Sequence, residues 1–424
     1  MIRTICFPSL LVLAGAWVIP AQPAGAVRAG GSSPRIEELK RRVSTGDSAV
    51  VAAFWATLGR EHAPIIEPFP GDEHQVLATL VWRGGPATRS VQVAGNQMAH
   101  IPSTDVWYAT LIAPSDYRFA YSFKTDGNAS PQPDPLNPHR LIAPIPQERP
   151  ASAVNKDSPY INSSIALMPQ APDSPWVDLR LGVAAGRVEE ASYPSKIYGG
   201  VRRVWIYDPP GDGTPAGLVV CLWGRDYLNE IPTPTILDNL LSEHKIPRLV
   251  AVFAETDNDR FQNFQVTRKF ADSFATELLP WIRGKERIPA DPRRIIVAGY
   301  SAAGLAATFV AFQHPELAGN VLAQSGAFWR GFDGEGASEY EWLAARYAAG
   351  PVRQTRFYLH VGAREDRRAG GSGPVFREAN QRLRDVLVKR GYAVSYDEVP
   401  GAEHEFIHWR SKFGDGLVYL TSGW

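Results

Sequence analysis

Cysteine is scarce in this chain: 424 residues contain two, Cys6 and Cys221. Cys6 lies in an amino-terminal leader, so the mature chain keeps only Cys221 and can form no internal disulfide bond. Cys221 lies in the apolar run at residues 218–222. A single cysteine in such a run is typical of a small core residue rather than of a nucleophile.

An excess of charge and a long hydrophobic run are also missing. The 44 basic and 44 acidic residues balance, so we expect no nucleic-acid partner and no membrane-surface partner for the protein as a whole. The apolar run at residues 7–19 is too short to span a bilayer. It follows Arg3 and precedes the small residues at 24–26, which predicts a signal peptide over residues 1–26 and a periplasmic or secreted protein without a membrane span.

The remaining pattern predicts two domains joined by a connector. Residues 27–130 read as leading helices followed by short alternating strands, which predicts a small β-sandwich. Residues 131–195 are rich in Pro, Ser and Ala and have little periodicity, as in an extended connector that is laid against the domains. Over residues 196–424 apolar strands alternate with helical patterns, which predicts an α/β domain with a mostly parallel sheet.

Residues 295–304, IIVAGYSAAG, predict a buried strand that turns sharply into a helix with Ser301 at the bend. This is the pattern of a nucleophile elbow, where small residues flank the serine to avoid backbone clashes. Gly299 and Ala303 fill these positions, Ala303 less well than a glycine would. The turn places the amide of Ala302 at a helix N-terminus, where it can donate to an oxyanion.

An acid and a histidine follow the serine in the chain order of the α/β-hydrolases. Glu365 and Asp366 come just after a strand-like run that ends at Gly362, and His404 comes just after the next strand. Ser301 would attack an acyl carbon, His404 would carry its proton, and a carboxylate would orient the imidazole. Both acids lie in the right loop for this task.

His404 and His408 also match the zinc pattern H-E-x-x-H. A protease of that type needs a third protein ligand further along the chain, but the residues after His408 contain no histidine, no glutamate and one acid, Asp415. We therefore expect no metal and no cofactor. His408 reads as a packing or rim residue.

Several motifs outside the elbow resemble the enterochelin (enterobactin) esterases, from roughly residue 75 to the end of the chain. The most specific are Met-Pro-Gln-Ala-Pro at residues 168–172 and Gln-Ser-Gly at residues 324–326. The other segments that carry the likeness are residues 104–107, 134–138, 202–206, 277–280, 362–365 and 379–381, with His404, Trp409 and Arg410.

The resemblance implies an α/β-hydrolase domain preceded by a β-sandwich, and a serine esterase that opens the ester bonds of a catecholate trilactone siderophore. It places the orienting acid at Glu365, which ends the Gly-x-Arg-Glu motif. It also implies that the oxyanion loop follows the strand containing Cys221, with the backbone amide of Arg225 beside that of Ala302. The chain departs from the family at Ala303, where a glycine is usual, and in its leader, which many members lack.

Four residues that lie close in sequence to a proposed site residue, or to an aromatic residue expected beside the site, are candidates for substrate binding: Arg225, Trp329, Arg330 and Arg410. Guanidinium groups suit a polyanionic ferric catecholate in charge and in ring stacking. The alternative is that the arginines are solvated surface residues, as most charged residues are.

Two other functions stay open at this point. A carbohydrate or feruloyl esterase could use the β-sandwich as a sugar-binding module, although the motif at residues 168–172 argues against it. A non-catalytic siderophore-binding protein could share the scaffold, because a fold alone does not establish activity. The intact set of Ser301, Glu365 and His404 argues for an enzyme.

Overall fold

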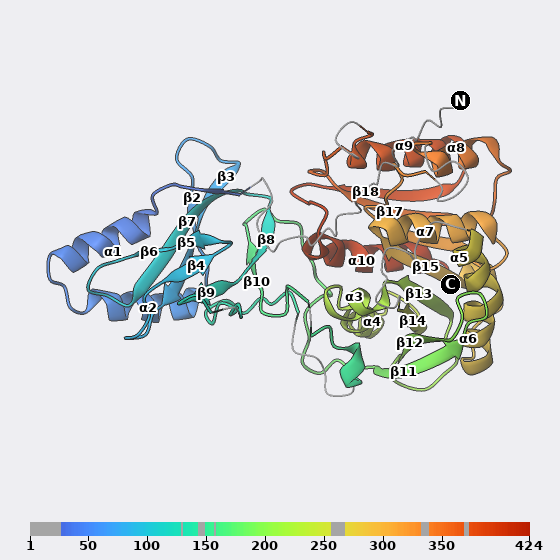
Figure 1. The fold of residues 1–424 in the computed structure, drawn as a ribbon, viewed down its shortest axis with the longest axis horizontal. Coiled ribbons are helices and arrows are strands. Elements are labelled where there is room, and N and C mark those ends of the chain that lie inside the picture. Colours follow the sequence, from blue (N-terminus) through green and yellow to red (C-terminus); the bar gives the residue numbers. More distant parts are fainter. Residues whose placement is uncertain are drawn as a thin grey trace, which may run out of the picture.

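The computed structural model describes residues 27–128, 130–142, 149–156, 158–255, 268–331, 339–368 and 373–424. The expected signal peptide, residues 1–26, lies outside the described residues. Two units lie side by side, an N-terminal β domain with two helices and a larger α/β domain (Figure 1). Within the described ranges, no helix has both the length and the apolar character needed to cross a membrane.

The N-terminal domain consists of three small antiparallel sheets and two helices. Along β3 the side chains alternate: Val76, Ala78 and Leu80 lie in a core shared by all three sheets, whereas Val81 packs with the helices. The expected small β-sandwich with leading helices is confirmed. Its elements are α1 (Pro34–Ser44), α2 (Val50–Glu61), β1 (Arg28–Ala29), β2 (Ile65–Pro68), β3 (Gln75–Arg83), β4 (Val91–Val93), β5 (Asn96–Gln97), β6 (Ala99–His100), β7 (Val106–Pro114), β8 (Arg118–Tyr121), β9 (Phe123–Thr125) and β10 (Ser164–Leu167).

The connector is shorter than the predicted residues 131–195, and both of its boundaries need correction. β10 pairs with β8, and the adjoining Met168 lies in the N-terminal core. β11 (Arg187–Pro194) pairs along its whole length with β12 (Val201–Asp208) and forms an edge of the large sheet. Pairing with partners distant in the sequence recruits both segments, and such pairing leaves little trace in the local sequence pattern.

The larger domain is built on an eight-stranded sheet in the order β11-β12-β14-β13-β15-β16-β17-β18. The strands from β13 to β18 run parallel, and β12 is antiparallel to both of its neighbours. The predicted α/β-hydrolase fold with a mostly parallel sheet is confirmed. The remaining strands are β13 (Gly217–Leu222), β14 (Leu249–Ala254), β15 (Ile295–Tyr300), β16 (Asn320–Gln324), β17 (Arg356–Gly362) and β18 (Ala393–Val399).

Helices cover both faces of this sheet because its central strands are apolar on both sides (Figure 1). On β13, Leu218 and Val220 pack with helices α5 to α9, whereas Val219 and the fully buried Cys221 pack on the side of α3, α4 and α10. The helices are α3 (Gly224–Asn229), α4 (Thr233–Ser242), α5 (Arg268–Ser273), α6 (Leu279–Lys285), α7 (Ser301–Gln313), α8 (Trp342–Ala349), α9 (Phe376–Lys389) and α10 (Phe406–Thr421), with a π-helical turn (Phe274–Leu278) and two 3-10 turns (Ala151–Ala153 and Pro292–Arg294).

The N-terminal domain contacts the loops that follow β17 and β18. Arg364 forms an ion pair with Asp116 at 3.3 Å, and the rings of Tyr117 and His408 lie 5.8 Å apart. Gly401 lies so close to Asp116 that a Cβ atom there would be 2.2 Å from its carbonyl oxygen. The two domains therefore meet beside the carboxyl ends of the last two strands.

Candidate active site

β15 ends in a sharp turn that leads into α7 at Ser301. The φ angle of Ser301 is +50°, a left-handed conformation that is costly for a residue with a side chain. Glycine is needed at Gly299, because a Cβ atom there would lie 2.4 Å from the backbone of Ala303. Ala303 itself is accommodated, with its methyl group buried in the core. The residues that the sequence predicts as a nucleophile elbow therefore form such an elbow in the structure.

His404, between β18 and α10, contacts both other members of the expected catalytic set. Its Nε2 atom lies 3.0 Å from Ser301 Oγ, and its Nδ1 atom lies 2.8 Å from Glu365 Oε2. If the neutral ring donates its Nδ1–H to the carboxylate, Nε2 is left free to accept the serine proton. The three residues come from the carboxyl ends of β15, β17 and β18, which lie along one edge of the parallel sheet.

Glu365 is held by several hydrogen bonds in a buried position, its side chain only 1% exposed. Oε1 accepts from the hydroxyl of Ser325 at 2.5 Å and from the backbone N–H of Gly362 at 2.8 Å. Burial raises the pKa of the Glu365 carboxyl, but nearby His404 and these hydrogen bonds outweigh it and hold the pKa below its ordinary value. The carboxylate is therefore ionised at neutral pH.

The neighbouring acid, Asp366, points elsewhere. Its side chain is 62% exposed and pairs with Arg377 at 2.8 Å. Of the two acids that the sequence leaves open, the structure brings Glu365 to His404.

Ser325 and Trp409 support Glu365, a role that the sequence pattern does not assign to them. The indole N–H of Trp409 donates to Ser325 Oγ at 2.7 Å, while the Ser325 hydroxyl donates to Glu365. Both residues are buried, and Ser325 has a φ of +46°. The Gln-Ser-Gly motif marks the position, but only the fold shows which carboxylate the serine meets.

Two backbone amides lie at the same edge of the sheet as the serine. Adjacent strands β13 and β15 run parallel, so the turns that follow them are neighbours. Ala302 is the second residue of α7, and the amides of a first helical turn have no carbonyl partner inside the helix. Arg225 follows a tight turn in which Trp223 has a φ of +62° and Gly224 lies against the end of β14. Both predicted oxyanion donors are thus on the catalytic edge.

The arginines expected to bind substrate lie in different environments. The Nε atom of Arg225 lies 3.2 Å from Glu255 Oε2, so part of its charge is neutralised within the protein. Arg330 is half-buried. Arg410 is 2% exposed and donates to the carbonyl oxygen of Leu141, in the segment between β9 and β10. The prediction that Arg410 meets substrate is therefore wrong, because its buried guanidinium holds α10 against the segment between β9 and β10.

Trp329 packs near His404 through the ring of Phe376. Its ring centroid is 6.0 Å from that of Phe376, whose own ring is 4.7 Å from that of His404. Trp329 is partly exposed, so it remains a candidate for contact with a substrate at this edge.

The two histidines of the H-E-x-x-H pattern, His404 and His408, lie in different environments. Both ring nitrogens of His404 have protein partners, Ser301 and Glu365. His408 is buried, and burial together with the nearby charge of Arg118 lowers the pKa of His408 well below its ordinary value. In the part of the chain that the structure describes, no three His, Cys, Asp or Glu residues cluster in a way suited to a metal ion.

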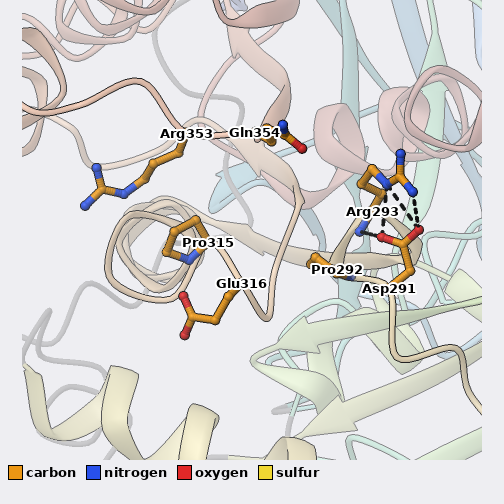
Figure 2. Close-up of a pocket in the computed structure, with 7 residues that line it drawn as sticks. All are labelled: Asp291, Pro292, Arg293, Pro315, Glu316, Arg353 and Gln354. Atoms are coloured by element: carbon orange, nitrogen blue, oxygen red, sulfur yellow. Dashed lines mark hydrogen bonds and ion pairs between the residues drawn. The ribbon is translucent and has the colours of Figure 1, made fainter.

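A cavity of about 510 Å³ lies at the other end of the strands (Figure 2). Its residues precede β15, β16 and β17, whereas the catalytic set follows the strands. Arg293 and Asp291 pair with each other at its rim. This cavity is therefore separate from the candidate site. It is lined by Asp291, Pro292, Arg293, Pro315, Glu316, Arg353 and Gln354.

An elbow serine in contact with a histidine and a buried carboxylate, at the carboxyl edge of this sheet, defines a hydrolase of the α/β type. The chain belongs to the family described as "Putative esterase", which matches residues 195–420, and is a carboxylic ester hydrolase. The resemblance to the enterochelin esterases is also confirmed.

Similar proteins align over both domains. The iron(III) enterobactin esterase of Dickeya dadantii (strain 3937) is 26% identical over 95% of this chain and 97% of its own. The iron(III) salmochelin esterase of Escherichia coli O6:H1 is 25% identical over 91% and 97%. A crystal structure of the enterobactin esterase of Shigella flexneri in the presence of enterobactin shares the fold, with a TM-score of 0.64, 24% identity and coverage of 86% and 97%.

Proposed function

We propose that the protein is a serine esterase that hydrolyses the ester bonds of a catecholate trilactone siderophore of the enterobactin type and so releases its iron. The observation that carries the chemistry is the continuous hydrogen-bonded series of Ser301, His404 and Glu365. The substrate class is supported by the iron(III) enterobactin and iron(III) salmochelin esterases, which resemble this chain along nearly all of its length.

In the first half of the reaction, Ser301 Oγ attacks the ester carbonyl carbon while His404 Nε2 takes the hydroxyl proton. The amides of Ala302 and Arg225 donate to the oxygen that becomes negative in the tetrahedral intermediate. His404 then gives the proton to the leaving alkoxide, which departs as an alcohol and leaves the acyl group on Ser301.

Water completes the cycle. His404 removes a proton from the water as it attacks the acyl-enzyme. As the second intermediate collapses to a carboxylic acid, His404 gives this proton to the departing Ser301 Oγ and both residues return to their starting state. In each half the imidazole becomes positively charged. The ionised, buried carboxylate of Glu365 stabilises that charge and keeps the ring in the reactive tautomer.

Arg225, Trp329 and Arg330 are the substrate-binding candidates that remain. Trp329 is supported by its place beside Phe376 and His404. Arg225 is supported by its position in the proposed oxyanion turn, although Glu255 offsets part of its charge.

A periplasmic or secreted location is also part of the proposal. It is supported by the short apolar run at residues 7–19 and the small residues at 24–26. Fractionation of cells that express the full chain, with sequencing of the mature amino terminus, tests it. We expect a mature protein that starts near residue 27 outside the cytoplasm; an uncleaved cytoplasmic chain would contradict this part.

The catalytic assignment is tested with Ser301→Ala. We expect hydrolysis of enterobactin to fall by several orders of magnitude, because the residual rate then depends on the oxyanion donors and binding alone. Binding of the substrate, followed by quenching of tryptophan fluorescence, should persist. A variant that retains more than a few per cent of the activity, in a preparation free of other esterases, would show that Ser301 is not the nucleophile.

A further inference from the structure

A hydrogen bond joins the two turns that carry the oxyanion donors. Tyr300, the residue before the elbow serine, donates its hydroxyl proton to Asp226 Oδ2. Asp226 is the residue after Arg225. Tyr300 is 5% exposed and Asp226 is 1% exposed, so the bond is shielded from water.

The sheet alone does not fix these turns relative to each other. The paired residues of β13 and β15 end at Cys221 and Ala298, so both donors lie beyond the last paired position. Both turns also contain a residue with a side chain in the left-handed region, Trp223 at φ +62° and Ser301 at φ +50°. Such conformations persist only where surrounding contacts hold them.

The ring of Tyr300 is itself packed in place. It stacks on Trp409 with centroids 4.3 Å apart and planes 22° apart, and it lies 4.7 Å from the ring of Trp223. The direction of the hydroxyl group is therefore set by the core. Through its bond to Asp226, the hydroxyl group in turn holds the turn that contains Arg225 in place.

We propose that Tyr300 and Asp226 are positioning residues that set the separation of the two oxyanion donors, the amides of Ala302 and Arg225. The inference rests on the proposed serine esterase mechanism and assigns a role that the triad itself does not contain. An oxyanion hole stabilises the transition state only when its donors lie within hydrogen-bonding distance of the developing charge. Loosening the link should therefore slow the chemical step and leave ground-state binding nearly unchanged.

Tyr300→Phe is the direct test, because it keeps the stacked ring and removes only the hydroxyl group. We expect kcat to fall by about 10- to 100-fold, less than the 10²- to 10³-fold typical when a donor is removed outright. KM should stay within about twofold. The affinity for an aryl trifluoromethyl ketone, whose adduct with the serine carries an oxyanion, should fall by about the same factor as kcat.

Tyr207→Phe is the matched control. Tyr207 is buried in β12 and donates to Asp238 at 2.6 Å, so this variant loses the same kind of bond. Tyr207 lies at the end of the sheet away from Ser301. We expect a comparable loss of thermal stability and an unchanged kcat.

Asp226→Asn is a second variant with a milder change, since its amide oxygen can still accept from Tyr300. We expect an intermediate kcat and a ketone affinity between those of the wild type and Tyr300→Phe. A Tyr300→Phe protein that loses stability like Tyr207→Phe but keeps wild-type kcat and ketone affinity would overturn the inference. If Tyr300→Phe does not fold, wild-type values for both quantities in Asp226→Ala, which removes the acceptor, would overturn it instead.

Ser301→Ala in the same assays separates this inference from the proposed function. An active Ser301→Ala protein would contradict the mechanism itself. An inactive Ser301→Ala protein beside a fully active Tyr300→Phe protein would contradict only the positioning role.

Discussion

Glu365→Gln removes the charge of the triad carboxylate with little change of shape. The amide oxygen can still accept from Ser325 and Gly362, which turns the NH₂ group toward His404 Nδ1. The imidazole must then carry its proton on Nε2 to accept from this group. In that tautomer it cannot take the proton of Ser301.

The expected loss is large and falls on turnover. In a well-studied serine protease the equivalent acid-to-amide change lowers kcat about 10⁴-fold, and we expect about 10³- to 10⁴-fold here. At about 1.4 kcal/mol per factor of ten, this is about 4 to 5.5 kcal/mol of transition-state stabilisation. KM should change little, because the imidazolium charge forms only during the reaction.

Asp366→Asn is the matched control one position along. Asp366 is the exposed member of its ion pair with Arg377, and surface pairs contribute about 0–1 kcal/mol to stability. We expect a kcat within about twofold of wild type. Initial rates of enterobactin hydrolysis, with melting temperatures to verify folding, give the ranking. The reverse ranking would transfer the role to Asp366, and no loss in either variant would leave a Ser301–His404 dyad.

Three further predictions use the same assays. Ser325→Ala should lower kcat at least tenfold and cost about 1–3 kcal/mol of stability, because Glu365 loses a donor and the Trp409 N–H loses its buried acceptor. Burial and the charge of Glu403 raise the pKa of Glu405 to about 8. The Glu405 carboxyl therefore lowers the stability of the folded chain increasingly as pH rises from 4.5 to about 8. Glu405→Gln should therefore raise the melting temperature more at about pH 8 than at about pH 5. Activity on iron-free enterobactin should be unaffected by EDTA.

Each of these three predictions would be contradicted by a specific result. Wild-type kcat in a folded Ser325→Ala protein would show that Glu365 needs no such support. An equal gain for Glu405→Gln at both pH values would show that the carboxyl ionises normally in the folded chain. Activity that disappears with EDTA and returns with stoichiometric zinc would contradict the proposed metal-free mechanism.

The fold and the three central site residues were accessible from sequence because each has a local signal. The elbow requires small residues around Ser301, and parallel strands bring residues that follow them to one edge, as with Glu365 and His404. The choice of Glu365 over Asp366 came from the resemblance, since adjacent side chains in a loop point in directions that the sequence does not specify.

The remaining features depend on contacts between distant segments. The prediction for Arg410 is wrong because no local pattern shows that the segment between β9 and β10 covers this side chain. Ser325 meets Glu365, and Tyr300 meets Asp226, only because their strands are neighbours in the sheet. β10 and β11 owe their strand character to the distant segments with which they pair.

The most direct test of the proposed function is product analysis of the purified mature chain with ferric enterobactin, iron-free enterobactin and a feruloylated sugar, beside Ser301→Ala as the control. We predict that the wild-type chain opens enterobactin to linear dihydroxybenzoyl-serine products with a much higher kcat/KM than it shows for the sugar ester, and that Ser301→Ala yields none of these products. Preferred release of ferulate, or binding of enterobactin without any hydrolysis by the wild-type chain, would contradict it.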